Sequence, residues 1–443
     1  MTLPVSWTAT TLGAVTERPL YGWTTKAKSS GRGLKFLRTT DISDGTVNWD
    51  TVPFCFEDPP DPGKYLLAVG DIVISRAGSI GLSALVESGP RAVFASYLIR
   101  FRPKPPINPR YVAWFLQGTD YWSQVEASAS GIALQNVNAK KLSAIALPLA
   151  PLREQTRIVA AIEEHLSRLD AAVAALERVR DALPRHRAAV LKAACEGKLV
   201  ERNAEAVRLK ALLKEPLRNG HSAKKVSGNG NGVRTFTLSA VTNRDFSIQN
   251  TKLTVAMAQR VRELWAQPGD IFVERSNTPE LVGTAALYRG EPDFAIFPDL
   301  LIRVRIKEPN LPEYVELVLR SEELRRYFRA SAQGIAGSMP KIDQAAIAEA
   351  PIPLPSVADQ QRILVEVDRR LSLADAADRA VSAGLAKAKR LRQAILKRAF
   401  EGKLVPQDPH DEPASVLLER IRKERASAAP VARTHSKRAR AKE

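Results

Sequence analysis

The stretch Glu196-Gly197-Lys198-Leu199-Val200 occurs twice in this sequence, because the same five residues return in the same order from Glu401 to Val405. It closes a longer repeat, in which residues 148–200 align without a gap to residues 353–405. Within that alignment Pro148-Leu149 matches Pro353-Leu354, and Gln155 matches Gln360. An internal repeat of this length indicates that one structural element is used twice.

Both copies of the repeat have the apolar spacing of long helices that pack against another helix. Apolar residues recur every three or four positions, as a helix–helix seam requires. The first series is Ile162, Leu166, Leu169, Val173, Leu176 and Leu183, and the second is Val367, Leu371, Ala374, Val381, Leu385 and Ile395. Two matched copies favour an antiparallel pair over an amphipathic helix on an ordinary core. Pro184 removes a backbone donor, so we expect a kink or a break there.

The segments that precede the two helices are related more distantly. Gly70-Asp71-Ile72 matches Gly269-Asp270-Ile271, and Tyr111-Val112 matches Tyr314-Val315; residues 131–133 and 334–336 also match. We expect mixed α+β domains with strands over 71–74 and 96–101. Helices are expected over 110–126 and 313–329, each opened by a proline at position 109 or 312. The helical segments kept their sequence while the domains diverged, which indicates a shared task for the helices and different tasks for the domains.

The repeat divides the chain into five segments. They are a first domain (1–147), a first spacer helix (148–200), a second domain (201–352), a second spacer helix (353–405) and a C-terminal segment with a basic tail (406–443).

The composition points to a polyanionic partner. Among 443 residues, Lys and Arg number 66 and Asp and Glu number 48, which gives a formal charge of +18. A protein this basic most often binds nucleic acid. Only two cysteines are present, and neither a signal peptide nor an apolar run long enough to span a membrane is found. We therefore expect a cytoplasmic protein without a disulfide framework.

Motifs of catalysis are missing or poorly formed. Asn108-Pro109-Arg110-Tyr111 is close to the Asn-Pro-Pro-Tyr motif of adenine methyltransferases, but its third residue is Arg, and the duplicated position reads Leu311-Pro312-Glu313-Tyr314. A helix start explains it better. No phosphate-binding loop of the Walker type is present, and the five histidines do not stand near the two cysteines at zinc-ligand spacing. We expect no catalysis, no metal and no cofactor bound by this chain.

Candidate DNA contacts lie on loops that carry donors, acceptors and positive charge, which reading of base edges and binding of phosphates both need. One kind of loop follows the Gly-Asp strand, and a second follows the Gly-Ile-Ala element. A third is a basic loop in the first domain. The candidates are Ser75, Arg76, Ser79, Arg275, Ser276 and Asn277; Gln135, Asn136, Ser338 and Lys341; and Lys26, Lys28 and Arg32. Each of them is also explained as an ordinary solvated surface residue.

Taken in order, these motifs resemble those of the specificity subunits of type I restriction–modification systems, over nearly the whole chain. The resemblance rests on the duplicated helix entries and ends, and on shorter matches along the domains. These are Glu154-Gln155 and Asp359-Gln360, the two Glu-Gly-Lys-Leu-Val runs, the opening around Trp7, Leu12 and Gly13, residues 38–42, 70–72, 212–220, and 412–421.

This resemblance implies two target-recognition domains, each reading one half of an asymmetric bipartite site in double-stranded DNA. It implies that the paired helices act as a spacer, give the chain a pseudo-two-fold axis, and dock two methyltransferase subunits, with restriction/translocase subunits completing the complex. S-adenosylmethionine, ATP and Mg²⁺ are then expected on those partner subunits. The alternatives left open are a stand-alone DNA methyltransferase and a coiled-coil scaffold for another anionic partner.

Overall fold

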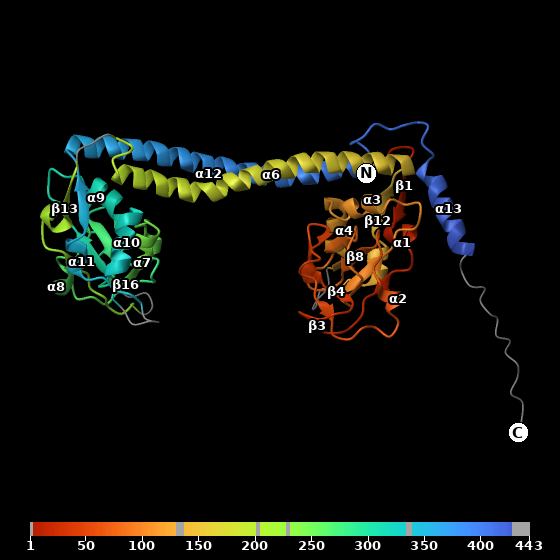
Figure 1. Ribbon diagram of the computed structural model, residues 1–443, viewed down its shortest axis with the longest axis horizontal. Helices are drawn as coiled ribbons and strands as arrows, with labels where there is room; N and C mark the ends of the chain where they lie inside the picture. Colours follow the sequence, from red (N-terminus) through yellow and green to blue (C-terminus); the bar gives the residue numbers. More distant parts are fainter. Residues whose placement is uncertain (1–2, 130–136, 201–203, 227–230, 334–338, 428–443) are drawn as a thin grey trace, which may run out of the picture. The chain divides into compact units, whose positions relative to one another are not determined.

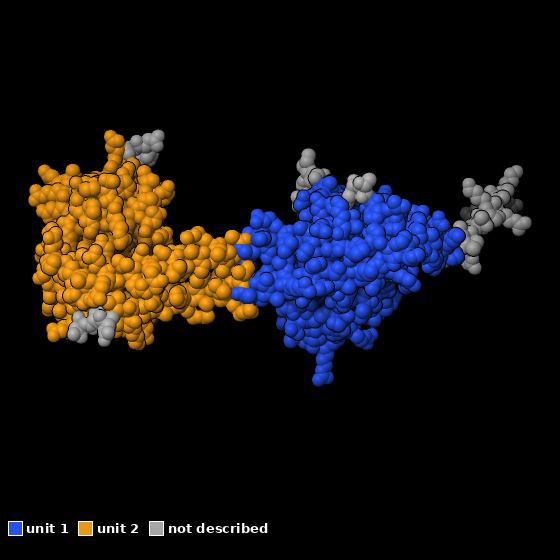
Figure 2. Space-filling view, turned by 90° about the horizontal axis from the view of Figure 1, so that it is seen from above, with its two compact units in different colours: residues 1–175, 384–443 blue, residues 176–383 orange. Residues whose placement is uncertain are grey.

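The computed structural model describes residues 3–129, 137–200, 204–226, 231–333 and 339–427, and they form two compact units (Figures 1 and 2). Unit 1 comprises residues 1–175 and 384–443, and unit 2 comprises residues 176–383. Each unit therefore combines one α+β domain with part of each of two long helices.

The two long helices are α6 (Leu152–Cys195) and α12 (Val357–Phe400), each of 44 residues (Figure 1). They pack against each other, and all twelve predicted seam residues are buried or half-buried. In unit 1 Asp170 of α6 meets Arg392 of α12, and in unit 2 Arg187 meets Asp375. The residue numbers rise along α6 as they fall along α12, so the helices are antiparallel. The predicted helix pair and the mixed helix-and-strand fold are confirmed.

Of the kink or break predicted at Pro184, the break is wrong, because α6 continues through this residue. A proline inside a helix removes one intrahelical hydrogen bond. Leu183 is buried in the seam, and one turn later Arg187 donates to Asp375 at 2.8 Å and to Asp378 at 3.3 Å. Contacts on both sides of the proline thus keep the helix whole.

The repeated Glu-Gly-Lys-Leu-Val run ends both helices in the same way. Gly197 and Gly402 have φ of 73° and 69°, the left-handed region that favours glycine. Lys198 N then donates to Ala193 O at 2.9 Å, and Lys403 N donates to Arg398 O at 2.8 Å. This is the Schellman pattern of a helix C-terminus.

The domain of unit 1 contains two four-stranded sheets, with strand orders β2-β11-β8-β9 and β10-β4-β7-β3, and two short antiparallel pairs, β1-β12 and β5-β6. The strands are β1 (Thr8–Thr11), β2 (Leu20–Tyr21), β3 (Ala27–Lys28), β4 (Lys35–Leu37), β5 (Ile42–Ser43), β6 (Thr46–Val47), β7 (Phe54–Cys55), β8 (Ile72–Ser75), β9 (Ser83–Leu85), β10 (Ala92–Phe94), β11 (Leu98–Phe101) and β12 (Ala146–Leu149). The helices are α1 (Leu12–Val15), α2 (Pro62–Tyr65), α3 (Pro109–Phe115), α4 (Thr119–Ala129), α5 (Ala139–Ser143) and the C-terminal α13 (Ala414–Ser427).

The domain of unit 2 repeats the first of these sheets in the order β14-β19-β17-β18 and repeats the pair β1-β12 as β13-β20, while β15-β16 forms a further pair. The strands are β13 (Glu205–Arg208), β14 (Arg218–Asn219), β15 (Val233–Phe236), β16 (Thr251–Thr254), β17 (Ile271–Glu274), β18 (Ala285–Leu287), β19 (Leu301–Val304) and β20 (Pro351–Leu354). The helices are α7 (Leu238–Thr242), α8 (Ala258–Val261), α9 (Pro312–Leu319), α10 (Glu322–Ser331) and α11 (Gln344–Ala348).

Each helix predicted over 110–126 and 313–329 is in fact two helices, α3 with α4 and α9 with α10. Proline opens α3 and α9, as expected. In unit 2 Ser321 starts a new helix by accepting a hydrogen bond from Leu324 N at 3.3 Å. In unit 1 the chain turns at Gly118, whose N donates to Phe115 O at 3.0 Å. These turns are too short to interrupt the apolar pattern of the sequence.

The same two contacts hold each domain at the entry to its long helix. Tyr111 donates its hydroxyl to Pro148 O and Tyr314 donates to Pro353 O, both at 2.7 Å. Gln155 and Gln360, on the first turns of α6 and α12, accept a backbone N–H just before α3 or α9, both at 3.1 Å. The duplicated Gln therefore joins domain to helix, and the duplicated Tyr holds α3 or α9 to the strand that leads into the helix, β12 or β20.

Candidate nucleic-acid interface

The two kinds of loop that the sequence singles out lie side by side in each unit. In unit 1 Arg76, after β8, accepts a hydrogen bond at its carbonyl from Val137 N at 3.0 Å. In unit 2 Arg275, after β17, accepts from Ile342 N at 2.9 Å. Arg76 and Arg275 hold the same position in the two related sheets, as do Val137 and Ile342 before α5 and α11. The candidates Gln135, Asn136 and Ser338 lie outside the described residues.

In unit 1 only part of the first loop is available to a ligand. Ser75 is buried, and its hydroxyl donates to Ala77 O at 2.9 Å, which stabilises the turn. Ser79 is exposed at the tip. Arg76 is half-buried, with its guanidinium carbon 5.1 Å from the centre of the Tyr21 ring. A loop with a fixed base and an exposed tip is suited to contact with a ligand.

The matching loop of unit 2 also has a buried part and an exposed part. Ser276 is buried and forms an antiparallel bridge with Lys341, whose side chain is exposed. The Asn277 amide donates to Glu274 at 2.6 Å and accepts from Thr278 N at 2.8 Å, so it supports the loop. Burial raises the pKa of Glu274, against the effect of its donors Thr242 and Asn277. Arg275 and Lys341 remain as the basic side chains of this site.

Two residues at this site were missed in the sequence, Tyr21 on β2 and Asn219 on β14. Tyr21 pairs with Ile99 and Asn219 with Ile302, which are equivalent residues of β11 and β19. The Tyr21 hydroxyl accepts a hydrogen bond from Ala139 N at 2.9 Å, and Asn219 Oδ1 accepts one from the side-chain amide of Gln344 at 3.1 Å. A glycine follows each of them, Gly22 and Gly220, and this repeated glycine is the signal that the sequence offers. Only glycine fits there, because a Cβ at either position would lie within 2.5 Å of a neighbouring carbonyl oxygen.

The basic loop with Lys26, Lys28 and Arg32 belongs to a different sheet, at the edge strand β3. Lys26 and Arg32 are exposed and Lys28 is half-buried. None of the three forms an ion pair within the described parts of the chain. This loop is therefore a charged surface separate from the loop of Arg76.

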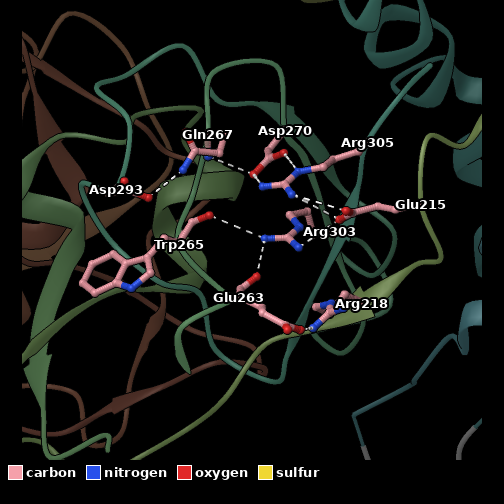
Figure 3. A network of polar contacts seen from close by, with 9 residues as sticks. All are labelled: Glu215, Arg218, Glu263, Trp265, Gln267, Asp270, Asp293, Arg303 and Arg305. Carbon is pink, nitrogen blue, oxygen red and sulfur yellow. Dashed lines mark hydrogen bonds and ion pairs between the residues drawn. The ribbon is translucent and has the colours of Figure 1, made fainter. Parts of the chain in front are cut away.

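The alternating arginines of β11 and β19 are structural. Arg102 donates to buried Asp71 at 2.6 Å, and Arg305 donates to Asp270 at 2.6 Å. Figure 3 shows the network of unit 2, in which Arg303 also reaches Glu215 and the carbonyl oxygen of Glu263. Hydrogen bonding to Asp71 raises the pKa of Arg102, whereas burial lowers that of Arg303. These charges are used inside the domains.

The described residues form neither the methyltransferase motif nor a metal-binding group. Asn108 caps α3 by accepting from Arg110 N at 3.0 Å, and Tyr111 is fully buried, so the Asn-Pro-Arg-Tyr sequence is a helix start. No group of three or more His, Cys, Asp or Glu residues suitable for a metal occurs in the described ranges. None of the helices there is both long and apolar enough to cross a membrane.

Comparison with known proteins gives a consistent result. Residues 38–180 match the family model described as the type I restriction modification DNA specificity domain. The chain is 26% identical to the type I restriction enzyme EcoKI specificity subunit of Escherichia coli K12, covering 96% of this chain and 97% of that one. It is also 26% identical to the StySPI specificity subunit of Salmonella potsdam, covering 96% of each. In fold it is similar to the HsdS subunit from Thermoanaerobacter tengcongensis, with a TM-score of 0.61 at 20% identity over 91% of this chain and 98% of that one.

Proposed function

The chain belongs to the specificity subunits of type I restriction–modification systems, and we propose that each of its units reads one half of an asymmetric, bipartite DNA site. One observation carries this proposal. The same pair of loops is joined by the same backbone hydrogen bond in both units, at Arg76 and at Arg275, but different side chains surround the two arginines. A shared scaffold with different donors and acceptors is suited to reading two different sequences.

The chain is a specificity subunit and not a catalytic one. We assign S-adenosylmethionine, ATP and Mg²⁺ to partner subunits, and none of them to this chain. On this view methylation and cleavage are directed by the position of the complex on DNA, which this chain selects.

The paired helices are the proposed docking surface for methyltransferase and restriction subunits. The repeat is aligned without a gap over both helices. Outside the seam, Val365 and Leu373 of α12 are 65% and 58% exposed. Large apolar side chains on an exposed helix face are typical of a surface that a partner covers.

The test is a selection of DNA by the full chain in complex with its modification subunit, from duplexes with a long randomised segment. We expect the selected duplexes to share two different short sequences separated by a spacer of fixed length and free sequence. A single continuous motif, or two half-sites with the same sequence, would contradict the proposal.

A further inference from the structure

Arg76 of unit 1 is held in place without a charged partner. Its backbone N donates to Tyr97 O at 2.8 Å, and its carbonyl accepts from Val137 N at 3.0 Å. Its Nε is buried without a hydrogen-bond partner, and Arg76 forms no ion pair within the described ranges. Arg100 and Arg102, on the same sheet, are instead bound to the Leu66 carbonyl and to Asp71. The two Nη groups of Arg76 have no hydrogen-bond partner among the described residues and are left for a ligand, whereas the enclosed Nε is not.

The ring of Tyr21 fixes this guanidinium. The guanidinium carbon lies 5.1 Å from the ring centre, a distance at which a cation is attracted to an aromatic face. Tyr21 is itself held at both ends: its backbone pairs with Ile99 across the sheet, and its hydroxyl accepts a hydrogen bond from Ala139 N at 2.9 Å. Tyr21 is 39% exposed, so the pair of Tyr21 and Arg76 lies at the surface of the domain. An arginine held in this way loses less freedom when it binds than one on an unsupported loop.

Unit 2 has the same scaffold without the ring. Asn219 stands in the place of Tyr21 and makes the equivalent contact, accepting the Gln344 amide at the start of α11 at 3.1 Å. Arg275 stands in the place of Arg76, and its N donates to Leu300 O, where unit 1 has Tyr97. Among the described residues, an aromatic ring therefore supports the arginine in unit 1 and not in unit 2.

We propose that Arg76 reads a guanine in the half-site bound by unit 1, and that Tyr21 is the residue that positions it. This inference rests on the proposed DNA-reading function. A guanidinium held in a fixed plane can donate two parallel hydrogen bonds, and guanine presents two acceptors, N7 and O6, side by side in the major groove. Asn219 cannot stack in this way, so the device contributes to the difference between the two half-sites.

The experiment uses the full chain in its modification complex and duplexes that carry the motif selected by the wild type. Each G·C pair of either half-site is replaced in turn, and relative affinities are measured by competition. With Arg76→Ala we expect discrimination at one G·C pair of one half-site to fall about 10- to 100-fold. Discrimination in the other half-site serves as the internal control for folding and remains unchanged.

Variants of Tyr21 separate the ring from the hydroxyl. Tyr21→Phe keeps the ring and loses the hydrogen bond to Ala139, and Tyr21→Asn installs the residue that unit 2 uses. We expect Tyr21→Phe to keep the discrimination and Tyr21→Asn to lose it at the same base pair as Arg76→Ala. Arg91→Ala, at an exposed arginine of the same unit, is the matched control.

Three outcomes would overturn the inference. If Arg76→Ala lowers the affinity for all duplexes alike and makes its salt dependence shallower, Arg76 contacts a phosphate and not a base. Unchanged discrimination in Arg76→Ala would exclude it as a reader, and equal loss in Tyr21→Phe and Tyr21→Asn would exclude positioning by the ring. All three leave the proposed function standing, whereas failure of the wild type to select a bipartite motif would contradict that function itself.

Discussion

Arg187 of α6 donates to Asp375 of α12 at 2.8 Å, and the residues at the matching positions of the repeat, Arg392 and Asp170, form the same pair at 3.1 Å. The duplicated sequence thus places one ion pair in each unit. Because both pairs join equivalent residues, α6 and α12 meet in the same register in the two units. The register is therefore a property of the repeat, and charge is one of its determinants alongside the apolar seam.

Reversing one charge of this pair should destabilise unit 2, and reversing both should restore it. Arg187→Asp brings a third carboxylate beside Asp375 and Asp378, whereas Arg187→Asp with Asp375→Arg recreates an opposite pair. Because both side chains are partly exposed, we expect the native pair to contribute about 0.2–1 kcal/mol. Melting temperatures of the single and double variants measure this. A double variant no more stable than the single one would show that the pair has no role in register.

Phe400→Ala should destabilise unit 1 selectively. Phe400 is 2% exposed, and its ring lies 5.2 Å from that of Tyr111 and 5.3 Å from that of Phe115. Loss of a buried phenyl ring costs about 3–5 kcal/mol. Hydrogen exchange should speed up in α3 and α4 and stay unchanged in α9 and α10. Leu391→Ala, on the exposed face of the same helix, is the control, and an equal effect of the two would refute the assigned packing.

Glu274 should make unit 2 less stable as the pH rises. Burial raises its pKa above the ordinary 4.5, so the folded state holds a proton that the unfolded state releases. Between pH 4.5 and the pKa of Glu274 in the folded state, the unfolded state binds fewer protons than the folded state. A rise in pH through this range therefore lowers the free energy of unfolding. Glu274→Gln should remove this decline. The check is the melting temperature of unit 2 against pH, and parallel profiles of wild type and variant would contradict the assignment.

Much of the framework was predictable, because it depends on patterns close in sequence. The seam residues, the helix-starting prolines and the duplicated segments all follow from spacing along the chain. The joints between domain and helix follow less directly: Gln155 and Gln360 stood out as repeated residues, but their contact with the turn before α3 or α9 requires the folded chain.

The candidate site was predictable only in part, for a physical reason. Arg102 finds Asp71 thirty-one positions away, and nothing in the sequence distinguishes its paired charge from the unpaired charge of Arg76. Tyr21 and Asn219 occupy equivalent places, and the glycine that follows each of them marks the equivalence, although the two residues themselves differ. Side chains that differ between the two copies leave no repeat to detect, and these are the residues on which discrimination depends.

The basic loop of unit 1 should contribute to affinity and not to sequence choice. Replacing Lys26, Lys28 and Arg32 with Ala removes three charges that have no partner among the described residues. If all three contact phosphates, the slope of log affinity against log salt should become shallower by about 0.9 for each charge removed. The triple variant is compared with Lys198→Ala at the end of α6. An unchanged slope would place this loop away from the DNA.

Exchange of residues 1–146 for the matching domain of a relative should change one half of the recognised motif and leave the other half and the spacer as they were. Outside itself the exchanged segment contacts both long helices: the turn before α3 meets Gln155, Trp7 donates to Glu154 at 3.0 Å, and the rings of Tyr111 and Phe115 pack against Phe400. A relative that keeps these residues should therefore dock on α6 without disturbing unit 2. Helix α13 is not exchanged, and its Leu417, Leu418 and Ile421 belong to the core of unit 1. The relative that supplies the new domain should therefore have apolar residues in α1, which contacts α13. The measurement is the methylated motif in cells that carry the complex, with exchange of residues 201–352 as the reciprocal control. Changes in both half-sites after either exchange would contradict independent reading, because they would require the base contacts of one domain to depend on the other.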